Sequence, residues 1–164
     1  IVPAIKEKKC DIALLSINED FFLEQLTEYD ADTFHHNIML TDRLVACASI
    51  ASPLASKEVI EQADIATRPF TYLNVVPLFK TSGNNAQRAL YVSNNTEVHR
   101  LLMKEMDVVS LMPRYVFDKM LDNKHFVARP LEGAQQIIYH ATLYPETNPH
   151  PLLKELASIV ASVI

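Results

Sequence analysis

Three short segments of the chain are apolar almost throughout: Asp11–Ile17 (DIALLSI), Leu44–Ala48 (LVACA) and Asp107–Met112 (DVVSLM). A strand has this composition, instead of alternating apolar and polar residues, when both faces of its sheet are covered. Segments with helical periodicity lie between the apolar segments, and strands that alternate with helices pack as layered α/β folds. The sequence therefore predicts an α/β protein with a mainly parallel sheet.

Further elements follow from the same patterns. Strand character extends to three more segments: Pro69–Val76, Ala89–Ser93 and Gln136–Tyr144. Helices are predicted over Lys57–Ala63 with Ser56 as N-cap, and over Asn95–Met106, Tyr115–Leu121 and Pro151–Val163. The buried face of the helix Asn95–Met106 is expected to hold Val98, Leu101, Leu102 and Met106. Ile1–Lys9 reads as the end of a helix, so we expect that the first strand of the fold is missing from this chain.

Composition limits the classes of partner. The 164 residues carry 15 Lys and Arg against 20 Asp and Glu, a formal net charge of -5, which disfavours direct DNA binding. No apolar run approaches the roughly 20 residues that span a bilayer, and no signal peptide is visible, so no membrane contact is expected. Cys10 and Cys47 are expected to be buried, reduced thiols, which predicts a cytoplasmic location. A redox pair is the alternative, without a C-x-x-C motif to support it.

Several catalytic and cofactor motifs are absent from the sequence. The two glycines, Gly83 and Gly133, cannot form a phosphate-binding glycine loop, and there is no G-x-S-x-G motif. His35 and His36 are expected in a polar bend, and His99 and His140 have no partner at metal-ligand spacing, so all four are predicted to be surface histidines. We expect no catalytic residue, no metal and no cofactor.

Polar residues gather where predicted strands end. Ser16, Ile17 and Asn18 close the first strand, Leu73 and Asn74 close another, and Ser93-Asn94-Asn95-Thr96 stands between a strand and a helix. Hydroxyl and amide groups at several strand ends can converge on one small molecule, and a helix N-terminus suits a carboxylate or another anion. Taken singly, Ser93 or Asn95 can be an N-cap and Asn74 a turn residue.

The order of these motifs resembles the effector-binding domain of LysR-type transcriptional regulators, whose fold is similar to that of periplasmic solute-binding proteins. Asp11-Ile12-Ala13-Leu14 resembles the family's "D-[IL]-A-[IL]" strand. Leu44-Val45-Ala46 followed by Ser52–Ala55 resembles "L-V-x-V … H-P-L-A", with Ser52 in place of the histidine. Glu61–Phe70, Asn95–Pro113 and the final HPLLKEL resemble later motifs of the family, and the resemblance covers nearly the whole chain.

The chain departs from the family pattern at three places. Glu105 and Asp107 stand where the family has glycines, so the turn there must be built in another way. The connection from Asn74 to Arg88 is shorter than usual. The family's first strand and its N-terminal winged helix-turn-helix are not in this chain.

The resemblance implies two Rossmann-like α/β lobes of the type 2 periplasmic-binding-protein fold, hinged near Ala48–Ser52 and Tyr139–Tyr144. Lobe I would contain residues 1–48 and 141–164, and lobe II residues 49–140. A small effector would bind in the cleft between the lobes. The residues implied as effector contacts are Ser16, Ile17, Asn18, Tyr72, Leu73 and Asn74, with Ser93 and Asn94 as further candidates.

As in the family, the protein would form a homodimer or tetramer and would contact DNA only through the absent N-terminal domain. Two other functions remain open at this point. A solute-binding protein of an importer would use the same cleft but should carry a secretory signal or lipobox upstream. An enzyme of the same two-lobed shape would need a threonine or carboxylate placed for catalysis, and the sequence singles out none.

Overall fold

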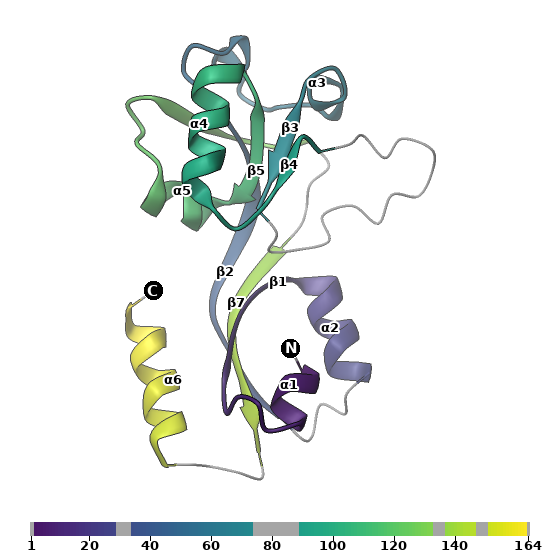
Figure 1. Cartoon of the computed structure of the whole chain (residues 1–164), viewed down its shortest axis with the longest axis vertical. Helices are drawn as coiled ribbons and strands as arrows, with labels where there is room; N and C mark the ends of the chain where they lie inside the picture. Colours follow the sequence, from purple (N-terminus) through teal and green to yellow (C-terminus); the bar gives the residue numbers. More distant parts are fainter. Residues whose placement is uncertain (1, 29–33, 74–88, 133–136, 147–150, 164) are drawn as a thin grey trace. The chain divides into compact units, whose positions relative to one another are not determined.

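The computed structural model describes residues 2–28, 34–73, 89–132, 137–146 and 151–163, which form two compact units (Figure 1). Unit 1 comprises Ile1–Asp42 and Ile137–Ile164, and unit 2 comprises Arg43–Gln136. The lobe boundaries expected from the sequence, after residues 48 and 140, lie a few residues later in the chain than these. The strand β2 (Phe34–Ser49) crosses the boundary after Asp42, so it contributes to both units.

Unit 1 is built around antiparallel strands. β1 (Ala13–Asn18) pairs with β7 (Ile137–Pro145), with Leu15 opposite Ala141 and Ser16 opposite His140, and β7 also neighbours β2. The helices α1 (Val2–Lys6) and α2 (Glu19–Glu28) lie on one face of this sheet. The core on that face contains Ile5, Leu15, Ile17, Phe22, Phe34, Ala141 and Leu143.

The helix α6 (Pro151–Val163) belongs to unit 1 and buries Leu153 and Ala157 against Tyr144. Pro at its first position costs no hydrogen bond because that N–H has no intrahelical acceptor. The opposite side of α6 leaves Leu152, Leu156 and Ile159 exposed.

Unit 2 combines antiparallel and parallel pairings. The second half of β2 pairs antiparallel with β5 (Val109–Pro113) and with β6 (Phe126–Pro130). β3 (Phe70–Tyr72) lies parallel to β5 on one side and to β4 (Tyr91–Val92) on the other. The core lies among Val45, Cys47, Leu73, Met103, Met112, Phe117, Leu121, Phe126 and Ala128. The helices α4 (Thr96–Met106) and α5 (Arg114–Met120) provide Met103 and Phe117 to this core.

The α/β class is confirmed, but the expectation of a mainly parallel sheet is wrong. Three of the described pairings, β1–β7, β2–β5 and β2–β6, are antiparallel. Continuous apolar segments reveal that a strand is covered on both faces, and this holds equally for antiparallel strands that have helices on each side.

Several local predictions need correction. The helix predicted over Lys57–Ala63 begins later than expected: a 3-10 helix, Pro53–Ser56, precedes the predicted segment, and α3 spans Gln62–Ala66. Its N-cap is Glu61 and not Ser56, because Glu61 and Asp64 form a reciprocal capping box. His35 and His36 lie within β2 and not in a bend. The strands and helices that the sequence did not predict are α2, β6 and the first ten residues of β2, Phe34–Arg43.

The predicted buried face of α4 is also wrong. His99 and Met103 are fully buried, whereas Leu101 and Met106 are 44% and 54% exposed. The buried pair is spaced four residues apart, as helix geometry requires, but one member is polar and was therefore not counted as core. Of the predicted strand Pro69–Val76, only Phe70–Tyr72 is a described strand, and residues 74–76 lie outside the described part.

Candidate functional site

The carboxyl ends of two parallel strands of unit 2 lie side by side, and the second of them leads into the N-terminus of α4. β3 ends at Tyr72 and β4 at Val92, in register with each other. Asn95 caps the helix that follows: its Oδ1 accepts hydrogen bonds from the backbone N–H groups of Glu97 (3.1 Å) and Val98 (3.4 Å). Ser93 Oγ accepts a further bond from the N–H of Asn95 at 3.1 Å. The polar segment between strand and helix is thus a capping structure, which also orients its neighbours Asn94 and Thr96.

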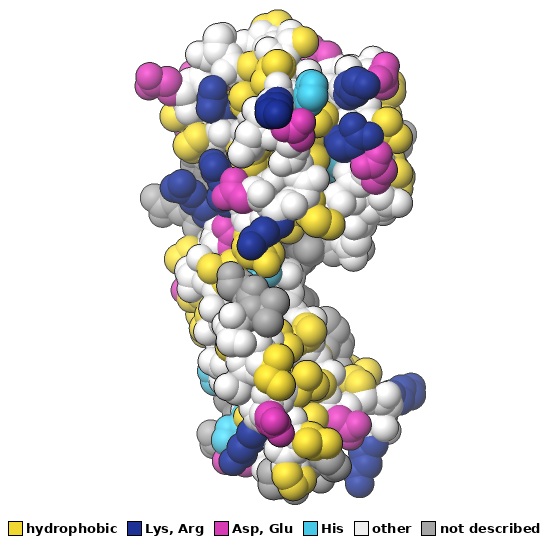
Figure 2. Space-filling model, turned by 90° about the vertical axis from the view of Figure 1, so that its left-hand side faces the viewer, with side chains coloured by type: hydrophobic (Ala, Val, Ile, Leu, Met, Phe, Trp, Pro, Cys, Tyr) yellow, Lys and Arg dark blue, Asp and Glu magenta, His cyan; other side chains and the backbone are white. Residues whose placement is uncertain are grey.

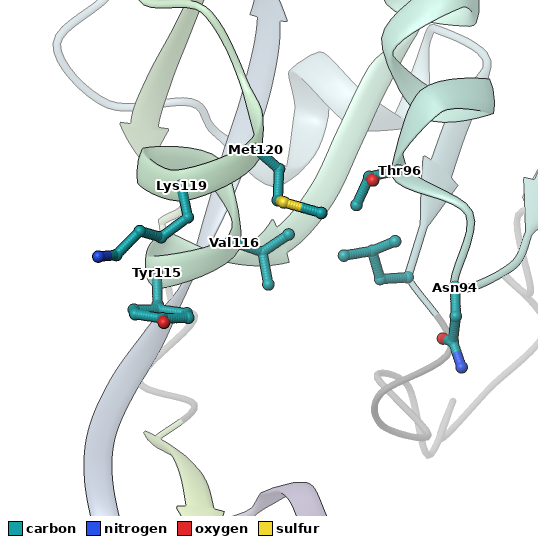
Figure 3. A pocket seen from close by; sticks show the side chains of 7 residues that line it. Asn94, Thr96, Tyr115, Val116, Lys119 and Met120 are labelled. Atoms are coloured by element: carbon teal, nitrogen blue, oxygen red, sulfur yellow. The ribbon is translucent and has the colours of Figure 1, made fainter. Parts of the chain in front are cut away.

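A surface pocket of about 390 Å³ lies beside this segment. It is lined by Leu73 after β3, by Asn94 and Thr96 at the start of α4, and by side chains of α5: Tyr115, Val116, Lys119 and Met120. Figure 3 shows Met120 extending from α5 toward Thr96, with Val116 beside it, whereas Lys119 extends away from the middle of the pocket. The volume is in the range that small-molecule sites occupy.

The pocket combines an apolar interior with polar groups at its margin. Leu73, Val116 and Met120 supply the apolar surface, and Thr96 and Asn94 supply a hydroxyl and an amide. The Lys119 ammonium lies 5.6 Å from the centre of the Tyr115 ring, a cation–π distance that places one positive charge at the rim. Such a lining suits a compact ligand with an apolar body and a hydrogen-bonding or anionic group.

A buried polar cluster lies behind the capping segment. His99 of α4, Thr71 of β3 and Ser110 of β5 are each 0% exposed. His99 Nδ1 lies 2.9 Å from Thr71 Oγ1 and 3.1 Å from Ser110 Oγ, and His99 Nε2 lies 3.0 Å from the carbonyl oxygen of Ser93. The prediction of a surface histidine is therefore wrong: three hydrogen-bond partners from other segments make burial of the imidazole tolerable.

Unit 1 contains a second polar cluster, on strands β1, β2 and β7. Ser16 Oγ lies 2.8 Å from His140 Nδ1, and His140 Nε2 lies 3.4 Å from a carboxylate oxygen of Asp42. Because a carboxylate only accepts, Nε2 carries a proton, and in the neutral form of the ring Nδ1 accepts the hydroxyl proton of Ser16. His140 is 8% exposed, so it too was wrongly predicted to be a surface residue; its partners are 98 and 124 positions away in the sequence.

The eight residues implied as effector contacts occupy different environments. Ser16 and Asn18 are partly exposed on β1, while Ile17 is packed in the core of unit 1. Tyr72 is partly buried, with its ring stacked 6.4 Å from that of Phe70. Leu73 and Asn94 line the pocket, Ser93 is adjacent to it, and Asn74 lies outside the described residues.

Sequence reasoning missed the part of the pocket on α5. Tyr115, Val116, Lys119 and Met120 were placed in a predicted helix but were not among the expected effector contacts. Met120 is 62% exposed, whereas Phe117 and Leu121 are buried. The position of α5 directly after the buried strand β5 was the available signal, since residues that follow a strand stand at the edge where ligands bind.

The described part of the chain lacks a metal-binding cluster and a membrane-spanning helix. Among those residues, no group of three or more His, Cys, Asp or Glu side chains is arranged to hold a metal ion. None of the described helices has the length and apolar character that crossing a membrane requires.

Comparison with known proteins identifies a family. The family model described as the LysR substrate binding domain matches residues 1–163. No curated protein sequence matches the chain.

Solved structures share the fold at low sequence identity. The regulatory domain of MetR from N. meningitidis, a LysR family regulator, is 15% identical, with a TM-score of 0.72 over 98% of this chain and 74% of that chain. A putative transcriptional regulator from Vibrio parahaemolyticus is 12% identical, with a TM-score of 0.70 over 98% of this chain and 74% of that chain. The OxyR regulatory domain from Pseudomonas aeruginosa is 12% identical, with a TM-score of 0.66 over 99% of this chain and 75% of that chain.

Proposed function

Because the chain belongs to the LysR substrate binding domain family, we propose that a small-molecule effector binds this regulatory domain and thereby controls DNA binding by an N-terminal winged helix-turn-helix of the intact regulator. The family match over residues 1–163, together with the α/β fold, carries the assignment. The domain is a non-enzymatic part of a transcription factor, in line with the expectation from the sequence.

We propose that the pocket of unit 2 receives the effector. Two observations support this proposal. The pocket lies at the carboxyl ends of β3 and β4, beside the N-terminus of α4, and it combines apolar and polar lining residues. Leu73, Thr96 and Met120 would contact the body of the ligand. Lys119 would attract an acceptor or anionic group, since its ammonium is at the rim.

Ser16, Asn18 and the other candidates of unit 1 remain proposed contacts. The hydrogen bond between Ser16 and His140 gives one chemical expectation for them. When His140 is neutral, Ser16 donates its proton to His140 Nδ1 and its own oxygen is left as an acceptor. An effector group that contacts Ser16 should therefore be a donor such as a hydroxyl, an amide N–H or an ammonium. That one effector touches residues of both units stays a prediction.

The proposed mechanism is a shift between two conformations of the regulator. An effector can shift such an equilibrium only by the difference between its affinities for the two conformations. A difference of about 1–3 kcal/mol, corresponding to about 5- to 150-fold, is typical of allosteric coupling. By family resemblance, the intact regulator is expected to act as a homodimer or tetramer in the cytoplasm, with DNA contacts made by its N-terminal domain.

The test combines a thermal-shift screen with a variant that fills the pocket. Metabolites that raise the Tm of the wild-type chain are first identified, with amphiphilic carboxylates included. Met120→Trp should then abolish the Tm increase, because the indole occupies the space between α5 and Thr96. Isothermal titration calorimetry with the same metabolites should show loss of measurable binding.

Met106→Trp is the matched control. Met106 is a similarly exposed methionine, 54% against 62% for Met120, at the far end of α4 and not among the residues that line the pocket. This variant should keep the full Tm increase. Equal responses of the two variants to a bound metabolite would contradict the assignment of the pocket.

A further inference from the structure

The proposed effector pocket depends on a segment with little regular structure of its own. Asn94 and Thr96 form one wall: Asn94 lies between the two-residue strand β4 and α4, and Thr96 is the first residue of α4. The backbone of Ser93 is held by its N–H, which donates to the carbonyl of Tyr72 at a long 3.4 Å. On the other side, the Ser93 carbonyl accepts a 3.0 Å bond from the imidazole of His99, one turn into the helix.

The protonation state of His99 follows from its partners. The Ser93 carbonyl can only accept, so Nε2 carries a proton and donates it. In the neutral ring the single lone pair of Nδ1 then accepts from the hydroxyl of Thr71 at 2.9 Å or of Ser110 at 3.1 Å. The ring of Tyr91, 5.5 Å away, is the titratable side chain that faces the imidazole from β4, while β3 and β5 present hydroxyls to it. The described neighbours therefore suit a neutral imidazole.

We propose that His99 is a positioning residue for the pocket: its neutral Nε2–H tautomer connects the Ser93–Thr96 wall to the sheet, and protonation of the ring removes the Nδ1 acceptor that holds the imidazole against Thr71 and Ser110. The inference rests on the proposed function, since it concerns the same pocket. His99 does not line the pocket and would act through Ser93.

The pH dependence follows from burial. Desolvation lowers the pKa of His99 below its ordinary value of 6.5, although the bond to Ser93 opposes this effect. The unfolded or detached imidazole consequently binds a proton at higher pH than the packed one. The contribution of His99 is complete above about pH 6.5 and is lost as the pH falls from there through the lowered pKa. The pocket wall should therefore loosen in mildly acidic solution.

Two substitutions separate the two ends of the imidazole. His99→Gln places an amide near the position of Nε2 and can still donate to Ser93. His99→Asn places an amide near the position of Nδ1, so it can bond Thr71 and Ser110 but cannot reach Ser93. Neither side chain titrates near neutral pH, so both variants should lack the decrease in stability below pH 6.5 that is expected from His99 in the wild type.

The experiment is hydrogen exchange of the apo protein followed by NMR. In His99→Asn, the amides of Ser93 and Asn95 should exchange about tenfold faster or more than in the wild type, because the segment opens locally. In His99→Gln they should stay near the wild-type rate. The amide of Leu121, which bonds the carbonyl of Phe117 in the same unit, should be unaffected in both and serves as the internal control.

Unchanged exchange of Ser93 and Asn95 in a folded His99→Asn protein would overturn the proposal. The wild type gives a second test that requires no substitution: two-bond ¹H–¹⁵N correlations of the imidazole should show the Nε2–H tautomer at neutral pH. A charged ring or the Nδ1–H tautomer would refute the inference. Neither measurement uses an effector, so failure of the metabolite screen and failure of this inference remain distinguishable.

Discussion

At the scale of single residues, Cys47 shows how burial determines chemistry. Its side chain is 0% exposed within the core of unit 2, among Val45, Met112 and Phe117. Desolvation raises the pKa of its thiol far above the ordinary value, while the charge of Arg114 opposes this only in part. The thiolate is the nucleophilic and oxidisable form, so the folded protein keeps Cys47 in its unreactive form.

We therefore predict that Cys47 is not modified by iodoacetamide at neutral pH until the protein is unfolded. Cys10, which is partly exposed in unit 1, should be alkylated first. Mass spectrometry of peptides after labelling with and without urea measures both rates. A Cys10→Ser protein provides the control, because it should incorporate no label in the native state. Rapid native labelling of Cys47 would show that its core opens readily.

Residue-level prediction succeeded where the partner of a side chain is close in sequence. Asn95 as a possible N-cap is confirmed, because the accepting oxygen and the donating N–H groups are two and three residues apart. The partners of His99 and His140 lie up to 28 and 124 positions away, respectively, and only the folded chain brings them together. A sequence pattern cannot show such partners, so both histidines were misplaced on the surface.

At the scale of elements, one residue explains how α4 ends without glycine. Asp107 follows the helix with φ 48° and ψ 43°, in the left-handed region that glycine usually occupies at this position. Its carboxylate also receives a 2.7 Å hydrogen bond from Arg68. The sequence predicted that this turn is built without the family's glycines. Here an aspartate occupies the left-handed position, and aspartate tolerates this region better than most residues.

This geometry predicts an unequal response to two substitutions. Asp107→Gly removes the steric cost of a Cβ in the left-handed region and loses the exposed ion pair with Arg68. That ion pair contributes at most about 1 kcal/mol to the free energy of unfolding. Asp107→Ala loses the same pair but keeps a Cβ, which costs about 1–2 kcal/mol in the left-handed region. Urea unfolding should therefore give a lower free energy of unfolding for the alanine variant, by about 1 kcal/mol or more. Arg68→Ala isolates the ion pair; equal stabilities of the glycine and alanine variants would contradict the backbone argument.

Helices with a periodic apolar face were predicted correctly, whereas segments whose faces carry both polar and apolar residues were not. α6 begins and ends where its pattern indicates, and α4 lies within one residue of its predicted start. In β2 only the apolar segment Leu44–Ala48 was predicted, although the strand begins at Phe34. Residues 36–43 of that strand are exposed or partly buried, so they lack the apolar composition that marks a covered strand.

At the scale of the whole molecule, the family and the fold were predicted from the order of short, mostly apolar motifs, none of which is specific by itself. The order of such motifs can be recognised at low sequence identity because each motif marks a buried strand or helix that the fold requires. The pairing of strands was beyond sequence reasoning: β1 pairs with β7 through residues more than 100 positions apart. Of the residues that line the candidate pocket, only Leu73 and Asn94 were among the expected effector contacts, because they follow strands, whereas α5 reaches the pocket through tertiary packing.

The distribution of charge leads to the last prediction, that this 164-residue chain does not bind DNA by itself. Affinity for DNA comes largely from Lys and Arg that displace counterions from phosphates. The chain has a net charge of -5, and on the face seen in Figure 2 the described basic side chains are interspersed with acidic ones. Some of the arginines are also neutralised locally, as in the pairs of Arg100 with Glu97 and Arg114 with Asp118.

An electrophoretic mobility-shift assay tests this at two salt concentrations. No shift should appear at about 150 mM salt with micromolar protein, and lowering the salt to about 50 mM should produce little change, because few phosphate contacts form. A protein with 6–10 such contacts would gain about 10³- to 10⁵-fold in affinity over a comparable range. A regulator that includes a winged helix-turn-helix is the positive control and should shift its operator. Nanomolar binding by the chain alone would place DNA recognition in the regulatory domain. It would contradict the proposal that only the N-terminal winged helix-turn-helix contacts DNA.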